Sequence, residues 1–307
     1  MKGKAIAKIA ICSVLAVVLA GILVLGLWGG DIILPNININ VFNGSDDVGY
    51  TIGDGTVMGR INELDIDWIS GSVTIKYHDG EETILRETKV EKEDHRMRYK
   101  LEGGVLSILP CKTGRVTVQL KNNEIKKDLE ILLPRDMAQV LEISLVSAKL
   151  SMEGIRMEEV EVDTVSGDIR LTDCTLDRLH VDGVSGNLYA ENTNLRILDM
   201  DGTSSNCNLK GQVEEVSIDT VSGNLNLDLE NHPVMVEMSA VSGNCDLTIP
   251  ADTQFRLECD GIKDKVNIVN FAVQKEDGVY QTSGWNHSGC DMGFDVVTGT
   301  VTITGAE

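Results

Sequence analysis

Aromatic residues are scarce in this chain: Phe, Trp and Tyr together make up 4 % of its 307 residues. Basic residues are also in the minority, with 27 Lys and Arg against 48 Asp and Glu and a formal net charge of −21. This charge argues against binding to nucleic acid or to an anionic membrane surface by electrostatic attraction. The 42 % hydrophobic content and the 30 glycines instead favour a narrow core filled by aliphatic side chains.

Sequence signatures of catalysis are missing as well. The chain has no Gly-x-Ser-x-Gly elbow, no His-Glu-x-x-His motif and no phosphate-binding loop. Gly53, Gly55 and Gly59 miss the Gly-x-Gly-x-x-Gly spacing by one residue, and the five histidines are scattered. We therefore predict that the protein is not an enzyme and has no cofactor.

One long uncharged run stands near the N-terminus. Residues 1–8 carry three lysines and are predicted to be a cytoplasmic tail, and residues 9–28 are long enough to cross the bilayer core as a helix. The run lacks an Ala-x-Ala-like exit, which favours a signal anchor; a cleaved signal peptide and a buried core helix are the alternatives. The lysines before the run and the acidic body after it predict a single-pass cell-membrane protein with an extracytoplasmic C-terminal domain. Residues 29–60, rich in Gly, Asn and Asp, are expected to be a linker.

A short phrase, Val-Ser-Gly-Asp/Asn, returns through the middle of the chain with small changes. Its copies have these central serines: Ser147, Ser166, Ser185, Ser204, Ser222 and Ser242. The steps between them are 19, 19, 19, 18 and 20 residues. Such a period is too short for a helical-pair repeat and matches one coil of a β-solenoid.

Apolar residues flank each serine at fixed distances. They stand six and four residues before it, and three and five residues after it. The column three residues after the serine is Leu150, Ile169, Leu188, Cys207, Leu225 and Cys245. Because a spacing of two is the strand period, each coil is predicted to hold two strands with alternate side chains turned inward. The Ser-Gly pair then supplies the corner between them.

These motifs resemble a known bacterial family. The Val-Ser-Gly-Asp/Asn phrase, the strand Leu129-Glu130-Ile131-Leu132-Leu133-Pro134 and the later Leu247-Thr248-Ile249-Pro250-Ala251-Asp252-Thr253 are similar to the "putative adhesin" family, a domain of unknown function. The resemblance extends from about Ile61 to the C-terminus. It implies the solenoid fold and a role at the cell surface, and some members of the family sit beside envelope-stress signalling systems. It supplies no catalytic residue.

The predicted fold class is therefore all-β: a parallel β-solenoid with coils of about 19 residues at 141–307, an irregular β cap at 61–140 and one N-terminal transmembrane helix. Residues 66–75 within the cap already have the pattern of a strand, a Ser-Gly corner and a second strand. After Pro250 we expect another coil, with residues 266–268 as its second strand, an excursion at 274–293 and a last coil at 294–304.

The seven cysteines do not form a zinc pattern, because none are spaced Cys-x-x-Cys. Cys207 and Cys245 lie two coils apart in one inward column, roughly 10 Å, which is too far for a disulfide. We expect both to be small core residues. Pairing among Cys111, Cys174, Cys259 and Cys290 stays open, and Cys12 lies in the apolar run.

Outward positions three and five residues before each serine form a face rich in carboxylates. Its acidic members are Asp163, Asp182, Asp201, Asp219, Glu142, Glu161, Asp199 and Glu237. One interpretation is a solvated, aggregation-resistant face. The other is a binding site for Ca²⁺, another cation or a cationic peptide, since oxygen-rich arrays suit hard cations. A column of asparagines at the Ser-Gly corner is expected to stack from coil to coil; it comprises Asn187, Asn206, Asn224 and Asn244.

Together these patterns predict a membrane-anchored, extracytoplasmic and non-catalytic protein of the bacterial surface that binds, as an adhesin does, or acts as a spacer. The alternative is an envelope-stress accessory or sensor that recognises cationic peptides or membrane-protein partners through the acidic face. A solenoid enzyme acting on polysaccharides would need aromatic sugar platforms, and the outward column of the second strand offers Tyr189 as its one aromatic residue.

Overall fold

The computed structural model describes residues 37–39, 49–88, 90, 92–112, 116–118, 126–135, 137–261, 265–285 and 289–306. The predicted cytoplasmic tail, the predicted transmembrane segment and most of the linker lie outside these ranges. Within them, no helix is long and apolar enough to cross a bilayer. A short 3-10 turn, η1 at Glu93–His95, is the helical element of the described part.

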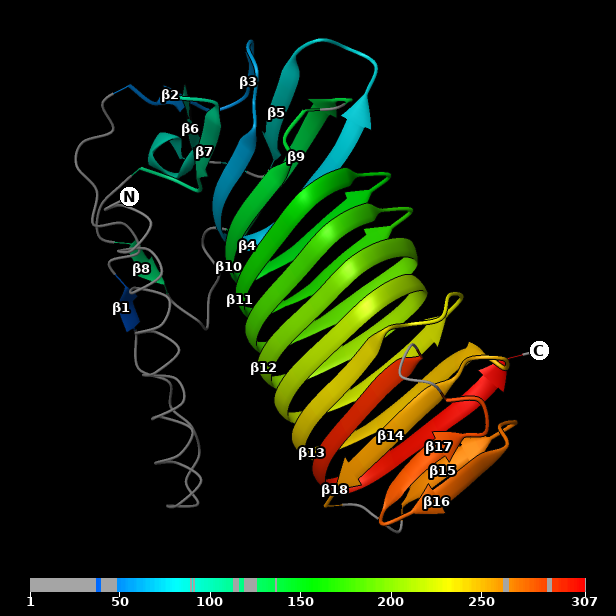
Figure 1. Cartoon of the computed structure of the whole chain (residues 1–307). Coiled ribbons are helices and arrows are strands. Elements are labelled where there is room, and N and C mark those ends of the chain that lie inside the picture. The colour runs from blue at the N-terminus through cyan, green and yellow to red at the C-terminus, as the bar shows by residue number, and fades with distance from the viewer. Residues whose placement is uncertain are drawn as a thin grey trace.

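The described chain is all-β, as predicted, and nearly all of it belongs to one mostly parallel sheet of 16 strands. The middle of this sheet consists of β10 (Val140–Glu153), β11 (Arg156–Thr172), β12 (Thr175–Leu229) and β13 (Met235–Pro250). Glu142 pairs with Glu161, which pairs with His180, so the register advances by 19 residues from one coil to the next. Figure 1 shows these strands wound as a stack of coils, with β12 passing through several turns. This pairing is that of a parallel β-solenoid.

The core of the stack consists of the predicted apolar columns. All members of the four columns between Leu141 and Leu247 are at most 4 % exposed. Burying one such aliphatic side chain contributes roughly 1.5–3 kcal/mol, and each column continues from coil to coil. The sequence repeat thus places aliphatic side chains in columns that form one continuous core.

The Ser-Gly corner needs glycine because the coils approach closely there. A Cβ built on Gly167 would lie 1.9 Å from the carbonyl oxygen of Ala148, and one on Gly223 would lie 1.9 Å from that of Ser205. These distances are far below any normal contact, so a side chain at either position would push adjacent coils apart.

A second corner follows the second strand of each coil. Gly154, Asp173 and Asn192 have φ values of 66°, 55° and 49°. This left-handed backbone is most accessible to Gly, Asn and Asp. The Asn192 side-chain amide also donates a hydrogen bond to the Asp173 carboxylate of the preceding coil.

The N-terminal end of the solenoid begins with a regular coil. This coil is β4 (Glu63–His78), in which Ser70 pairs with Ser147 of β10. The other edge of β4 is covered by β7 (Val105–Leu109) along its first half and by β9 (Lys127–Pro134) along its second half. Antiparallel strands extend this end: β2 (Thr51–Ile52), β3 (Gly55–Val57), β5 (Thr83–Thr88) and β6 (Arg98–Glu102). A separate pair consists of β1 (Ile37–Ile39) and β8 (Val116–Val118).

At the C-terminal end, the order of coils in space differs from their order in the sequence. The last strand, β18 (Cys290–Ala306), lies between β13 and the coil made by β14 (Phe255–Asp260) and β15 (Val266–Val269). A hairpin of β16 (Val273–Glu276) and β17 (Val279–Thr282) continues the sheet beyond β14. The coil that follows Pro250 in the sequence is therefore outermost, and the final coil is inserted beneath it.

Candidate functional site

The acidic columns lie on one face of the solenoid. Glu142 stands beside Glu161, and Asp163 stands beside Asp182 on the next coil. The face continues onto β4, where Asp65 pairs with Glu142. Neighbouring strands are about 4.8 Å apart, and like charges on adjacent strands raise the free energy of the folded state.

His180 is a cationic side chain within this face. Its Nδ1 lies 3.2 Å from a carboxylate oxygen of Asp199, and its Nε2 lies 3.6 Å from one of Asp182. The hydrogen bond with Asp182 and the negative charges of Asp182, Asp199 and Asp201 raise the pKa of His180 to about 9, against the opposing effect of partial burial. The imidazole is therefore protonated at neutral pH and offsets part of the surrounding negative charge.

Two carboxyl groups of the face have raised pKa values. Burial first, and then the charges of Asp182 and Asp199, raise the pKa of Asp201 above its usual value. Asp67, half-buried on β4, has its pKa raised to about 7 by burial first and then by the charge of Asp65. Both shifts mean that the negative form is disfavoured in the folded state.

The geometry around His180 suits a metal cation that displaces the imidazole proton, because a protonated ring nitrogen cannot be a ligand. One ligand atom each from His180, Asp182 and Asp201 can be chosen so that all three lie within 4.8 Å of one another. Ca²⁺ binds oxygen ligands at roughly 2.3–2.6 Å, whereas an imidazole nitrogen among carboxylates is typical of transition metals. The same face can also attract Lys or Arg side chains of a peptide.

The predicted asparagine column forms a continuous hydrogen-bonded ladder along the Ser-Gly corner. The Asn187 amide donates to Asp168 at 3.0 Å, and the Asn206 amide donates to the Asn187 side-chain oxygen at 2.8 Å. At the far end of the ladder, the Asn244 oxygen accepts a hydrogen bond from the hydroxyl of Thr300 at 2.8 Å. The asparagines therefore have the structural role that the sequence predicts.

The cysteines of the described chain are buried, and no disulfide joins them to one another. Cys207 and Cys245 are 0 % exposed, and Leu225 pairs with Cys245 in the shared inward column. Burial raises the pKa of the Cys207 thiol to about 12. A thiol in this environment is not a nucleophile at neutral pH.

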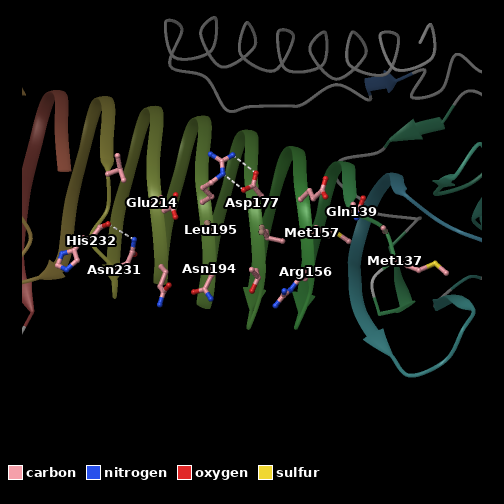
Figure 2. Close-up of a pocket in the computed structure, with 17 residues that line it drawn as sticks. Met137, Gln139, Arg156, Met157, Asp177, Asn194, Leu195, Glu214, Asn231 and His232 are labelled. Carbon is pink, nitrogen blue, oxygen red and sulfur yellow. Dashed lines mark hydrogen bonds and ion pairs between the residues drawn. The ribbon is translucent and has the colours of Figure 1, made fainter. Parts of the chain in front are cut away.

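A shallow groove of about 900 Å³ crosses the coils next to the second corner. Met157 and Leu195, each 4 % exposed, contribute to its base. Figure 2 shows Asp177 and Glu214 on one side of this base and Asn194 on the other. The rims are therefore polar.

One ion pair crosses two coils on the rim of the groove. Asp177 accepts hydrogen bonds from Arg196 Nε at 2.6 Å and from Arg196 Nη2 at 2.9 Å. These hydrogen bonds are the main reason that the pKa of the Asp177 carboxyl is lowered. The pair contributes little stability because both side chains are exposed. Sequence reasoning missed the groove because the residue type changes from coil to coil at each rim position.

A buried ion pair in the N-terminal cap was also not foreseen. Lys127 Nζ donates to Glu87 Oε2 and to the carbonyl oxygen of His95, both at 2.7 Å, and lies 4.6 Å from the ring centre of Trp68. Burial lowers the pKa of Lys127, and its contact with Glu87 opposes this shift. The pair joins β9 to β5 and to the η1 turn, in a region where the sequence has no period that could reveal it.

The family comparison matches most of the chain. The model of the Toastrack DUF4097 domain matches residues 61–303, which include the solenoid and its N-terminal end. No curated protein matches the sequence.

Three solved structures are similar to this chain over 83 % of its length. A "putative cell adhesion protein" from Clostridium sporogenes is 12 % identical, with 100 % of that chain covered and a TM-score of 0.27. A "putative adhesin" from Bacteroides fragilis is 10 % identical, with 97 % of that chain covered and a TM-score of 0.48. A "putative lipid binding protein" from Parabacteroides distasonis is 14 % identical, with 97 % of that chain covered and a TM-score of 0.44.

Proposed function

Because the chain belongs to the Toastrack DUF4097 family, a domain without an assigned activity, we propose that it is a non-catalytic protein of the bacterial cell surface. Its N-terminal helix anchors it in the membrane, and its solenoid lies outside the cytoplasm, where it binds a partner or acts as a spacer. The uncharged run at residues 9–28, with lysines before it and an acidic body after it, supports this topology.

The observation that carries the binding role is the charge arrangement around His180. A rigid sheet holds carboxylates from successive coils on one face, and the pKa of Asp201 is raised by burial first and then by the charges of Asp182 and Asp199. A divalent cation or a Lys-rich peptide relieves that repulsion in the folded state and has no comparable site in the unfolded chain, so its binding stabilises the fold by mass action. The alternative role, an envelope-stress accessory that senses cationic peptides or membrane-protein partners, uses the same face.

The topology is tested with the whole chain in bacterial cells. A reporter fused after residue 307 should be active only when it is exported, and the protein should stay with the membrane fraction after a carbonate wash. Recovery of a processed, soluble chain beginning near residue 20 would establish a cleaved signal peptide and overturn the anchor.

The acidic face is tested by thermal unfolding. Millimolar Ca²⁺ or a Lys-rich peptide should raise the melting temperature more than NaCl of equal ionic strength, because NaCl supplies screening only. The double change Asp182→Asn and Asp201→Asn should remove this extra increment. The matched control, Asp246→Asn with Asp277→Asn, changes the net charge equally at exposed sites outside the face and should keep it. Equal shifts from all three additives would mean that the carboxylates are a solvated face and bind nothing.

A further inference from the structure

The two ends of the solenoid are closed to different degrees. At the N-terminal end, Leu106 and Ile108 of β7 and Ile131 of β9 are 0 % exposed, because β6 and β5 pair with the outer edges of these strands. At the C-terminal end, β17 covers the outer edge of β14 in the same way. Within the described residues, β15 pairs with β18 alone, so its outer edge is open.

Burial confirms that the coil end at β15 is incompletely covered. Val301 and Ile303 of β18 are 0 % exposed, whereas Val266 and Ile268, their partners on β15, are only partly buried. Val269, which alternation places on the outward face, is 40 % exposed. Among the described residues, the inward columns are therefore less well covered on β15 than on β18.

The backbone of β15 presents hydrogen-bonding groups on the same side, where no other described strand pairs with it. The carbonyl of Lys265 accepts a hydrogen bond from the Val301 N–H at 3.1 Å, so it points toward β18. Because successive residues of a strand alternate, Val266 and Ile268 point their N–H and C=O groups away from β18. An open strand edge of this kind is a template for a further strand.

The charge of this edge points to the kind of strand it accepts. Residues 265–273 contain one lysine and no carboxylate, in a chain whose net charge is −21. The neighbouring edge strand β16, by contrast, carries Lys275 and Glu276, which are typical guards against edge pairing. Two copies of so acidic a protein repel each other over most of their surface, and this repulsion is weakest where carboxylates are missing.

We propose that β15 is a self-association edge at which two copies of this chain join end to end. A two-fold axis requires antiparallel pairing of the two β15 strands. With Asn267 on the axis, Val266 lies opposite Ile268 of the second copy, and their outward N–H and C=O groups pair. The apolar side chains of the two coil ends then cover each other. A contact through one short strand is small, so the dimer is weak and forms at high local concentration.

The position of this edge has a consequence that rests on the proposed membrane anchor. The N-terminal strands and β15 lie at opposite ends of the solenoid (Figure 1). Pairing through β15 therefore places the N-terminal ends of the two solenoids far apart. This arrangement suits two copies that are anchored in facing membranes. The self-association itself follows from the coil end and holds whether or not the chain is anchored.

The test is the mass of the full-length protein in detergent micelles as a function of concentration. Wild-type protein should shift from monomer to dimer as concentration rises. Asn267→Lys and Asn267→Asp each place like charges on the two-fold axis and should raise the dimer dissociation constant at least tenfold. Their equimolar mixture should restore dimers, since Lys then faces Asp. Asn226→Lys, at an exposed outward position of an inner coil, is the matched control and should dimerise as wild type does.

Three results would overturn the self-association edge. The first is a wild-type protein that stays monomeric at all concentrations. The second is a dimer that responds equally to Asn267→Lys and Asn226→Lys. The third is a failure of the equimolar mixture of Lys and Asp variants to form dimers. Circular dichroism of each variant confirms that the solenoid is folded. None of these results bears on cation binding or on topology, so the proposed function is tested separately.

Discussion

Replacing Gly223 by Ala tests whether the close approach of coils at the Ser-Gly corner requires glycine at this position. The added Cβ would lie 1.9 Å from the carbonyl oxygen of Ser205 and 3.0 Å from its carbonyl carbon. Both atoms belong to the backbone of the preceding coil and cannot rotate away. To bring the oxygen to an ordinary contact of about 3.4 Å, the corner must move by about 1.5 Å, roughly a third of the spacing of about 4.8 Å between strands.

A displacement of that size has a calculable cost. Overpacking in a rigid site costs about 1–3 kcal/mol, and each backbone hydrogen bond lost at the corner adds about 1 kcal/mol. We therefore expect Gly223→Ala to lower the free energy of unfolding by about 3 kcal/mol. For a domain of this size that corresponds to a fall of about 6–12 °C in melting temperature.

The measurement is thermal unfolding followed by circular dichroism in the β region. Gly293→Ala is the control, because a Cβ there would have a single contact, at 3.7 Å with the side chain of Glu237. It should change the melting temperature by less than 2 °C, a value within the range of surface substitutions of about 0.5 kcal/mol. Equal effects of the two changes would refute the argument that the glycine is required by the neighbouring carbonyl.

Three further predictions concern the core and the acidic face. Leu225→Asp buries a carboxylate between two cysteines and should unfold the stack, whereas Asn226→Asp, exposed on the same strand, should be mild; equal losses in melting temperature would disprove the register. Asp67 has a folded pKa of about 7, above its ordinary value of 3.8, so the fold loses stability as pH rises from 3.8 through 7. Asp67→Asn should therefore raise the melting temperature at pH 8 and not at pH 4. An equal gain at both pH values would contradict the raised pKa. The folded pKa of His180, about 9, is above its ordinary value of 6.5, so its stabilising effect is complete below pH 6.5 and lost as pH rises through 9; His180→Gln should lower the melting temperature at pH 6 and have little effect at pH 10, and the reverse order would contradict the assignment of charge.

The regular part of the fold could be predicted from the sequence because it depends on local spacing. A step of 19 residues fixes which side chains share a column, and the alternation around Ser166 or Ser222 fixes which columns turn inward. The asparagine ladder follows from the same arithmetic. None of these features needs information about contacts between distant segments.

The ends of the solenoid could not be predicted in the same way. The insertion of β18 beneath β14 and β15 depends on which coil edge the last strand meets. The alternating pattern of residues 294–304 suits a coil placed either next to β13 or beyond β14 and β15. The pair of Lys127 and Glu87 joins segments 40 residues apart without a repeat. The groove near Asp177 depends on side-chain lengths at positions with no period.

The acidic face shows why a rigid register and a binding surface go together. The carboxylates cannot move apart, because the buried columns and the asparagine ladder fix the spacing of the coils. Burial and this repulsion together raise the pKa values of Asp67 and Asp201, and the positive charge of His180 offsets part of the repulsion. A cation from solution would offset the same repulsion, and this is the physical basis of the proposed binding. If the proposal holds, the regular spacing that costs stability in the free protein contributes to the affinity for a cationic ligand.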